Sequence, residues 1–228
     1  MRRHFEIELE ALQGRVLEMG GLVQRAIHLS VESLQGRNIG AAAEATDEVI
    51  ERIEPSVNEL HREIDQRAID LLALQQVMAV DLRFVTAATR IGSDLERMSD
   101  RSVNIARRSI SILTNPNPKL VIQIPRMAET VEAMVRDSLA AFGSRDEDLA
   151  RSILDRDQEV DEYRDVVFQE LVDEVTVETR FIQQALDFIL ISRNLERIAD
   201  HATNIAESVV FMVAGEDIRH RYNTAASS

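Results

Sequence analysis

Two segments that lie 100 residues apart carry the same row of polar side chains. Positions 95–106 and 195–206 are identical at seven of their twelve places. The identities include a glutamate, an aspartate and an asparagine spaced four residues apart, which places them on one stripe of an α-helix. That stripe is separate from the apolar one that a helix bundle buries, so core packing does not explain why both copies contain it. The two polar rows are Glu96, Asp100 and Asn104, and Glu196, Asp200 and Asn204.

Paired carboxylates of this kind favour a hard cation. Two carboxylates at i and i+4 repel one another unless a cation compensates them. Oxygen ligands alone suit Mg, Ca, Mn or oxidised iron better than copper or zinc. One helix supplies too few ligands, but the middle helix expected in each half of the chain offers a second acidic pair. The sequence therefore predicts two metal sites, one formed by Glu96, Asp100, Asp47 and Glu51, and one by Glu196, Asp200, Asp157 and Asp161.

A surface without metal is the alternative interpretation of these acids. An acidic row on a helix is commonly a solvated face, and arginines three residues away offer local ion pairs, such as Arg97 with Asp100. A contact surface for a partner protein would also explain the repeat. The third helix expected along the chain, over residues 78–113, carries a basic stripe as well. This stripe is formed by Arg90, Arg97, Arg101 and Arg108. We interpret this stripe as pairing with acids of helix two, with an anion or partner contact as the alternative.

Signs of catalysis are missing from the sequence. The chain has no cysteine, which excludes thiol nucleophiles and cysteine-ligated zinc or iron–sulfur sites. His-Glu-x-x-His and Glu-x-x-His pairs are absent, which disfavours di-iron carboxylate oxidases. The sequence also lacks a Walker loop, Gly-x-Gly-x-x-Gly and Gly-x-Ser-x-Gly. We predict a protein that is not an enzyme. A metal-storing or metal-buffering helical protein and a metal-free helical adaptor remain alternatives.

Helical periodicity runs through almost the whole chain and predicts an all-α fold. Pro55 lies inside the second helix and should kink it. The stripe Leu195, Ile198, Ala202, Ile205 and Val209 should be buried in the sixth helix. The expected helices cover residues 5–34, 40–74, 78–113, 124–142, 146–175 and 178–213. They form a first three-helix bundle over 1–113, a linker over 114–123 that contains two prolines, a second three-helix bundle over 124–216 and a flexible tail over 217–228.

Charge and hydropathy restrict the partners. The 228 residues include 26 basic and 40 acidic side chains, a net charge of −14. This balance argues against nucleic acid and anionic lipid as ligands. The longest apolar run, 209–215, is far shorter than the ~20 residues of a membrane span, and acidic residues follow the first few positions where a signal peptide would be apolar. A cytoplasmic location is expected, without insertion into a membrane.

These features resemble a known family. Two tandem three-helix units that each end in Leu-Glu-Arg-x-x-Asp-x-x-x-Asn-Ile-Ala look like PhoU, a family of bacterial phosphate-transport accessory regulators. The opening pattern from Phe5 to Met19, the sequence Asp81-Leu82-Arg83 and the ending at 215–220 are similar too. The resemblance covers nearly the whole chain. It implies a PhoU-like fold in which two tandem three-helix bundles are related by an internal repeat.

The resemblance also implies a function. Members of the family are cytoplasmic, often homodimeric, and repress phosphate uptake and the phosphate-starvation response when phosphate is plentiful. They are thought to contact the ATP-binding subunit of the phosphate ABC transporter and a membrane sensor histidine kinase. Some bind multinuclear iron or other metals through acidic motifs, which fall here on 96–100, 196–200, 47–51 and 157–161. Because Glu51 ends its motif where aspartate is usual and Pro55 follows closely, the second site should match the family pattern better than the first.

Overall fold

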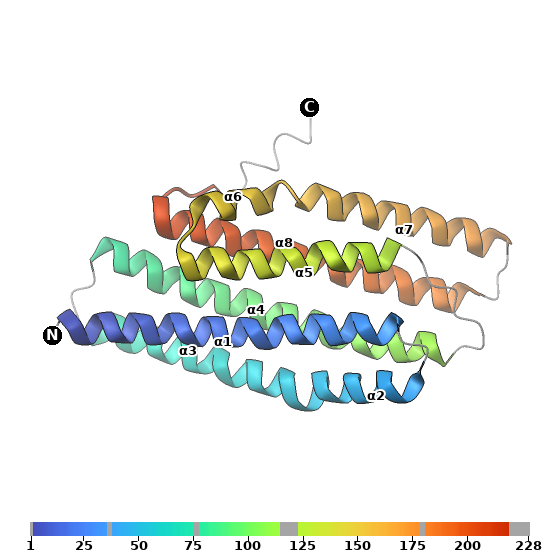
Figure 1. The fold of residues 1–228 in the computed structure, drawn as a ribbon, viewed down its shortest axis with the longest axis horizontal. Coiled ribbons are helices and arrows are strands. Elements are labelled where there is room, and N and C mark those ends of the chain that lie inside the picture. Colours follow the sequence, from blue (N-terminus) through green and yellow to red (C-terminus); the bar gives the residue numbers. More distant parts are fainter. Residues whose placement is uncertain (1, 36–37, 75–77, 115–122, 178–180, 219–228) are drawn as a thin grey trace.

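The computed structural model describes residues 2–35, 38–74, 78–114, 123–177 and 181–218, and every secondary-structure element in these ranges is helical (Figure 1). Each half contains three long rods, of which the middle one is interrupted. The all-α fold and the tandem three-helix halves are therefore confirmed. The first half contains α1 (Arg2–Gln35), α2 (Ile39–Glu48), the π-helical turn η1 (Val49–Ile53), α3 (Glu54–Leu74) and α4 (Ala79–Leu113). The second half contains α5 (Gln123–Ser144), α6 (Glu147–Leu154), α7 (Asp157–Val177) and α8 (Ile182–Ala214).

The disturbance expected at Pro55 takes the form of a π turn upstream of the proline. Pro55 is the second residue of α3 and has no N–H to donate, and its ring would clash with a carbonyl in the preceding turn of an ideal α-helix. The backbone N–H of Glu54 instead donates to the carbonyl of Val49, five residues back. The wider turn removes the clash and rotates the residues that precede it relative to those that follow.

The middle rod of the second half is also interrupted, which periodicity did not predict. One helix was expected over 146–175, but α6 ends at Leu154 and α7 begins at Asp157. The backbone N–H of Arg156 donates to the carbonyl of Ile153 in a tight turn. The turn contains three charged residues, Asp155, Arg156 and Asp157, and no proline or glycine. Aspartate side chains compete for nearby backbone groups, which favours a helix end where hydrophobic spacing alone predicts continuity.

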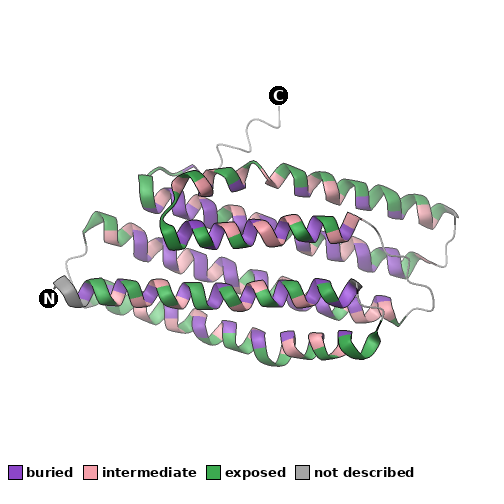
Figure 2. Cartoon of the chain, in the orientation of Figure 1, coloured by how far each residue is buried: buried purple, intermediate pink, exposed green. Residues whose placement is uncertain are grey.

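Helices α4 and α8 pack against each other along the centre of the molecule. They run in opposite directions, and their apolar stripes face a single core that includes residues from both halves (Figure 2). All five residues predicted for the stripe of α8, from Leu195 to Val209, are fully buried, which confirms that prediction. The expected bundles therefore share one core instead of forming two separate ones.

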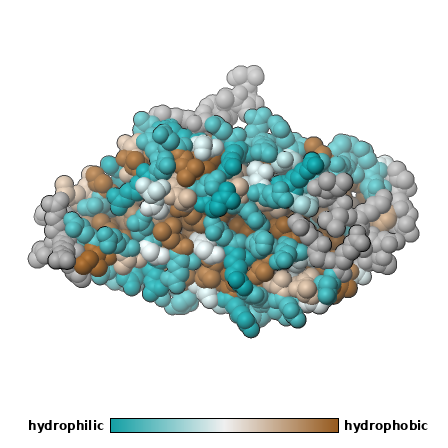
Figure 3. All heavy atoms as spheres, viewed as in Figure 1, coloured by the Kyte–Doolittle hydropathy of each residue, from teal (hydrophilic) through white to brown (hydrophobic). Residues whose placement is uncertain are grey.

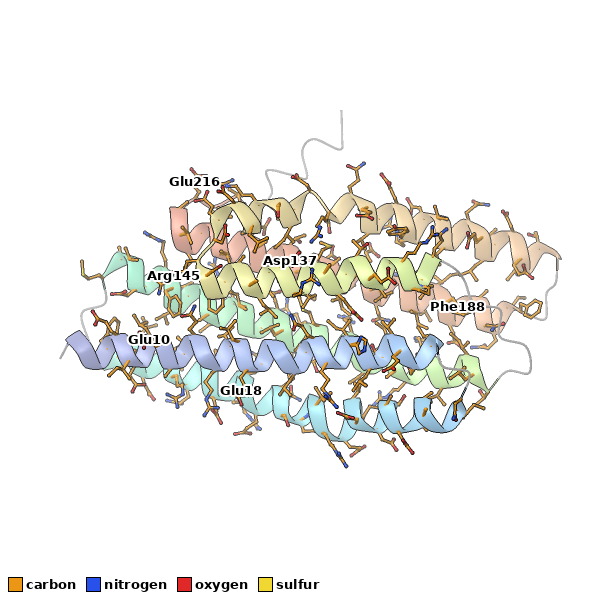
Figure 4. The ribbon with its side chains drawn as sticks, viewed as in Figure 1. Glu10, Glu18, Asp137, Arg145, Phe188 and Glu216 are labelled. Atoms are coloured by element: carbon orange, nitrogen blue, oxygen red, sulfur yellow. The ribbon has the colours of Figure 1, made fainter. Side chains whose placement is uncertain are left out.

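Other contacts join the halves outside this centre. The side-chain amide of Gln13 in α1 donates to the carbonyl of Gly143 at the end of α5, at 2.9 Å. Arg145 follows α5 (Figure 4). Its guanidinium lies over the ring of Phe84 in α4, 5.3 Å from the ring centroid. These contacts fix α5 against the first half, so the position of α8 relative to α4 is set by more than one pair of helices.

The predicted linker and tail lie mostly outside the described residues, which omit 115–122 and 219–228. Ile218 belongs to the stretch expected to be a tail, but its side chain is buried in the core. On the face drawn in Figure 3, hydrophilic residues cover most of the surface and apolar ones are scattered among them. Within the described ranges, none of the helices combines the length and the hydropathy that crossing a bilayer requires.

Candidate functional site

The four acids predicted for the second site come together in the structure. Asp157 and Asp161 lie on the first turns of α7 and face Glu196 and Asp200 of α8. The pKa of Asp157 is raised to about 6, mainly by burial and in part by the nearby carboxylates of Asp200, Asp161 and Glu196. Burial also raises the pKa of Asp200, with Glu196 adding to the effect and Arg197 opposing it. These acids therefore act on one another across the two helices.

Arginine side chains compensate part of this negative charge. Arg164 of α7 lies 2.7 Å from Glu196 and 3.0 Å from Asp161, and Arg197 lies 3.6 Å from Asp200. Burial raises the pKa of Asp161 and the charge of Arg164 opposes that rise. Asp157 forms no ion pair within the described chain. Among those same residues, no three acidic or histidine side chains are grouped closely enough to hold one ion as they stand. A metal would therefore have to displace Arg164 from Glu196 and Asp161.

The four acids predicted for the first site are arranged differently. Asp47, Glu51 and Asp100 are exposed and Glu96 is half-buried. Asp47 lies in α2, but Glu51 lies in the π turn, where one turn takes more than 3.6 residues. Residues that are four apart consequently do not lie on the same face of the helix there. Asp47 and Glu51 therefore do not form the regular acidic pair that was expected. The asymmetry agrees with the better match expected for the second half, and both metal sites stay predictions.

The basic stripe of α4 faces the other half of the molecule, so our interpretation that it pairs with acids of helix two is wrong. Arg108 donates to the buried carboxylate of Asp187 in α8 at 3.0 Å. Arg90 lies over the ring of Phe211, also in α8, at 5.3 Å. The remaining two members, Arg97 and Arg101, line a cleft between α4 and α8. Periodicity had shown that the arginines share one face but not which helix covers that face.

A buried polar cluster beside this cleft was not anticipated from the sequence. Asp94 of α4 accepts hydrogen bonds from Nδ1 of His201 at 2.9 Å and from the amide of Asn204 at 3.3 Å. Both Asp94 and His201 are buried. A signal was available in the internal repeat, because Asp94 corresponds to Asn194 and Arg101 corresponds to His201. The repeat is therefore broken at the residues that meet between the halves.

A comparison with protein families matches the internal repeat directly. The model for the PhoU domain matches residues 16–109 and again residues 124–209. The chain belongs to the PhoU family. Both copies of the acidic row lie inside the matched ranges, at the ends of the two PhoU domains.

Relatives extend the match over nearly the whole chain. A PhoU homolog from Pseudomonas putida, described as a phosphate-specific transport system accessory protein, is 34% identical over 219 residues, which is 96% of this chain and 84% of that protein. A homolog of the same description from Caulobacter vibrioides strain NA1000 is 37% identical and covers 92% of this chain and 90% of that protein. These descriptions concern accessory proteins of a phosphate transport system.

Solved structures of the PhoU family share the fold. The crystal structure of PhoU from Pseudomonas aeruginosa has a TM-score of 0.87 and 35% identity, and the match covers 93% of this chain and all of that one. The phosphate transport system regulatory protein PhoU from Streptococcus pneumoniae has a TM-score of 0.80 at 27% identity, with 93% and 98% covered. The fold of this chain is thus shared with these PhoU structures over 93% of its length.

Proposed function

We propose that this protein is a non-catalytic cytoplasmic regulator of phosphate uptake and of the phosphate-starvation response. It represses both when phosphate is plentiful, through contacts with the ATP-binding subunit of the phosphate ABC transporter and with the sensor histidine kinase. The single observation that carries the proposal is similarity over nearly the whole chain to accessory proteins of phosphate transport. A homodimer, expected from the family resemblance, forms part of the proposal.

Binding measurements with purified partners test the proposed contacts. The full chain is immobilised, and the ATP-binding subunit and the cytoplasmic part of the kinase from the same organism are passed over it separately. We expect saturable binding of each, and an unrelated ABC ATPase serves as the control. If neither partner binds better than the unrelated ATPase, the proposed mechanism is wrong.

We further propose that the acids of the second half bind a hard cation, such as iron in a multinuclear centre, Mn or Mg. Asp157, Asp161, Glu196 and Asp200 offer only oxygen ligands, and their mutual repulsion disappears when a cation binds. The bound cation would hold α7 against α8 and make the acidic surface rigid. The first-half acids Asp47, Glu51, Glu96 and Asp100 are proposed as a second site, which the π turn makes less regular.

Two matched variants separate the proposed metal sites. In one, the four second-half acids are changed to their amides, and in the other the four first-half acids are changed likewise. Each protein is purified without chelator, its metal content is measured by mass spectrometry, and thermal shifts are recorded with Mn, Mg and ferric iron. We expect the second-half variant to lose metal and thermal shift and the first-half variant to keep more of both. Unchanged metal content in the second-half variant would remove the site assignment.

The same measurements on the wild-type protein distinguish the alternative functions. Many ions per chain with redox turnover would favour a metal store, whereas a metal-free protein without any thermal shift would favour an adaptor.

A further inference from the structure

A cleft of about 810 Å³ lies between the two halves and collects arginines from both. Arg97 and Arg101 come from α4, and Arg193 and Arg197 come from α8. Asp157 and Asp200, from the acidic cluster of the second half, also line it. The cleft therefore presents guanidinium groups and carboxylates to the same space.

The antiparallel register of α4 and α8 explains why these arginines meet. Asp94 faces His201 and Arg108 faces Asp187, so the numbers of facing residues add to the same value along the interface. The internal repeat relates residues that differ by 100. Every facing pair consequently has an equivalent pair elsewhere along the interface. The equivalent of the pair Asp94 and His201 is the pair Asn194 and Arg101. Arg97 and its repeat equivalent Arg197 lie near the midpoint of the contact, where a residue comes close to facing its own equivalent.

The equivalent pair lacks a negative charge. His201 has the carboxylate of Asp94 as a partner, whereas the register of the two helices pairs Arg101 with the neutral side chain of Asn194, and both of these residues line the cleft. The amide nitrogen of Asn194 already donates to the carbonyl of Leu190, at 2.6 Å. Nε of Arg101 is buried without a hydrogen-bond partner. A buried donor that lacks an acceptor is costly, and more so when it carries charge.

Two further arginines of the cleft lack a carboxylate partner. Arg97 and Arg193 form no ion pair within the residues that the structure describes, whereas Arg197 lies 3.6 Å from Asp200. Arginines that are left unpaired beside an open cavity are suited to a ligand with several acceptor oxygens. Planar guanidinium groups donate two parallel hydrogen bonds to phosphate or carboxylate groups.

We propose that this cleft binds a phosphate group, either as inorganic phosphate or on a phosphorylated small molecule. Arg97, Arg101 and Arg193, which all line the cleft, donate to its oxygens and gain the acceptor that neither Asn194 nor a carboxylate supplies to them. In the metal-free chain, the carboxylates of Asp157 and Asp200 select for inorganic phosphate over sulfate. Inorganic phosphate keeps at least one proton near neutral pH and donates it in a hydrogen bond to a carboxylate. Sulfate has no proton to donate, and a phosphomonoester has lost its last proton above its second pKa of about 6.

The site lies where binding would alter the contact between the two PhoU domains. A ligand held by α4 on one side and α8 on the other stabilises one relative position of the halves. The role of this ligand as the signal that a phosphate regulator receives rests on the proposed function. The binding of the ligand does not depend on that function. The two can therefore fail separately, because partner binding and ligand binding are measured in different experiments.

Isothermal titration calorimetry of the full chain, dialysed against chelator, tests the proposal. The probes are inorganic phosphate, adenosine monophosphate and sulfate. We expect inorganic phosphate to bind at least about tenfold more tightly than sulfate, and still tighter binding of adenosine monophosphate would identify a phosphorylated small molecule as the source of the group. Absence of binding by both up to about 10 mM would overturn the proposal, and so would equal affinity for sulfate.

A substitution that completes the broken symmetry is the sharpest variant. Asn194→Asp places a carboxylate opposite Arg101, as Asp94 lies opposite His201, and should reduce phosphate affinity at least about tenfold without lowering the melting temperature. Gln183→Glu adds the same charge at an exposed position of α8 and should bind as the wild type does. Arg101→Gln removes the guanidinium and should lose binding too, which keeps the test valid if Asn194→Asp folds poorly. Wild-type affinity in both site variants would refute the assignment.

Discussion

At the scale of single residues, the second half contains a carboxyl group that is unfavourably placed for its charge. Asp157 is half-buried, has three other carboxyl groups near it and forms no ion pair within the described chain. The spacing of Asp157 and Asp161 was visible in the sequence. Their approach to Glu196 and Asp200 was not, because it depends on how α7 packs against α8. The sequence thus identified these acids but not the partner arginine, Arg164.

Changing Asp157→Asn should stabilise the metal-free protein at neutral pH. The folded-state pKa of about 6 lies above the ordinary 3.8 of aspartate, so the folded protein binds more protons than the unfolded one between these values. Asp157 therefore costs stability above pH 6, and this cost disappears as the pH falls toward 4. Because the group is partly solvated, we expect a gain of about 1–2 kcal/mol at pH 7.5 and almost none at pH 4.

Urea denaturation of both proteins in chelator across this pH range measures that difference. Glu170→Gln, which changes an exposed glutamate further along α7, is the control and should change little at either pH. A difference between wild type and Asp157→Asn that stays constant with pH would contradict the proposed origin of the effect. A variant that is less stable than wild type at pH 7.5 would contradict it as well.

The buried pair of Asp94 and His201 should contribute to stability across the contact between the halves. In Asp94→Asn, the amide no longer offers a charged acceptor to His201 and Asn204, both of which bond the same carboxylate oxygen. We expect a loss of about 1–3 kcal/mol in the free energy of unfolding. Asp70→Asn changes an exposed aspartate of α3 and should cost less than about 0.5 kcal/mol in the same denaturation experiment. Equal effects of the two changes would show that the buried contact is unimportant.

At the scale of the elements, hydrophobic periodicity predicted the long helices but not where the middle rods are interrupted. Pro55 gave a visible signal, although the structure accommodates it with a π turn over Val49–Ile53 instead of a simple kink. The turn at 155–156 gave no proline or glycine signal. Both interruptions occur beside candidate acids, namely Asp47 and Glu51 in the first half and Asp157 in the second. The geometry of the acids could therefore not be predicted from their spacing alone.

Two glycines on α1 should respond in opposite directions to the same substitution. A Cβ atom on Gly20 would lie 2.7 Å from the side chain of Leu139 in α5, whereas a Cβ on Gly14 would meet nothing within 4 Å. Gly14→Ala should stabilise the protein by about 0.5–1 kcal/mol, since alanine favours a helix. Gly20→Ala should destabilise it by about 1–2 kcal/mol, because the buried Leu139 has to move. Urea denaturation compares them, and a Gly20→Ala protein as stable as Gly14→Ala would show that α1 and α5 are not closely packed there.

At the scale of the whole molecule, the sequence predicted the fold and the family but not the way in which the halves meet. The repeat of 95–106 at 195–206 and the helical periodicity together indicated two three-helix units. Nothing in either pattern showed that α4 and α8 form one shared core. The cleft with its four arginines results from that contact. It could therefore not be predicted without knowing the register of α4 against α8.

The most direct test of the account is expression of a phosphate-regulated reporter in the host organism grown in rich phosphate. We predict that deleting the gene derepresses the reporter and that the wild-type gene restores repression. The surface variant Glu170→Gln should restore it equally well. A reporter that stays fully repressed in the deletion strain would contradict the regulatory function proposed for this PhoU-family protein.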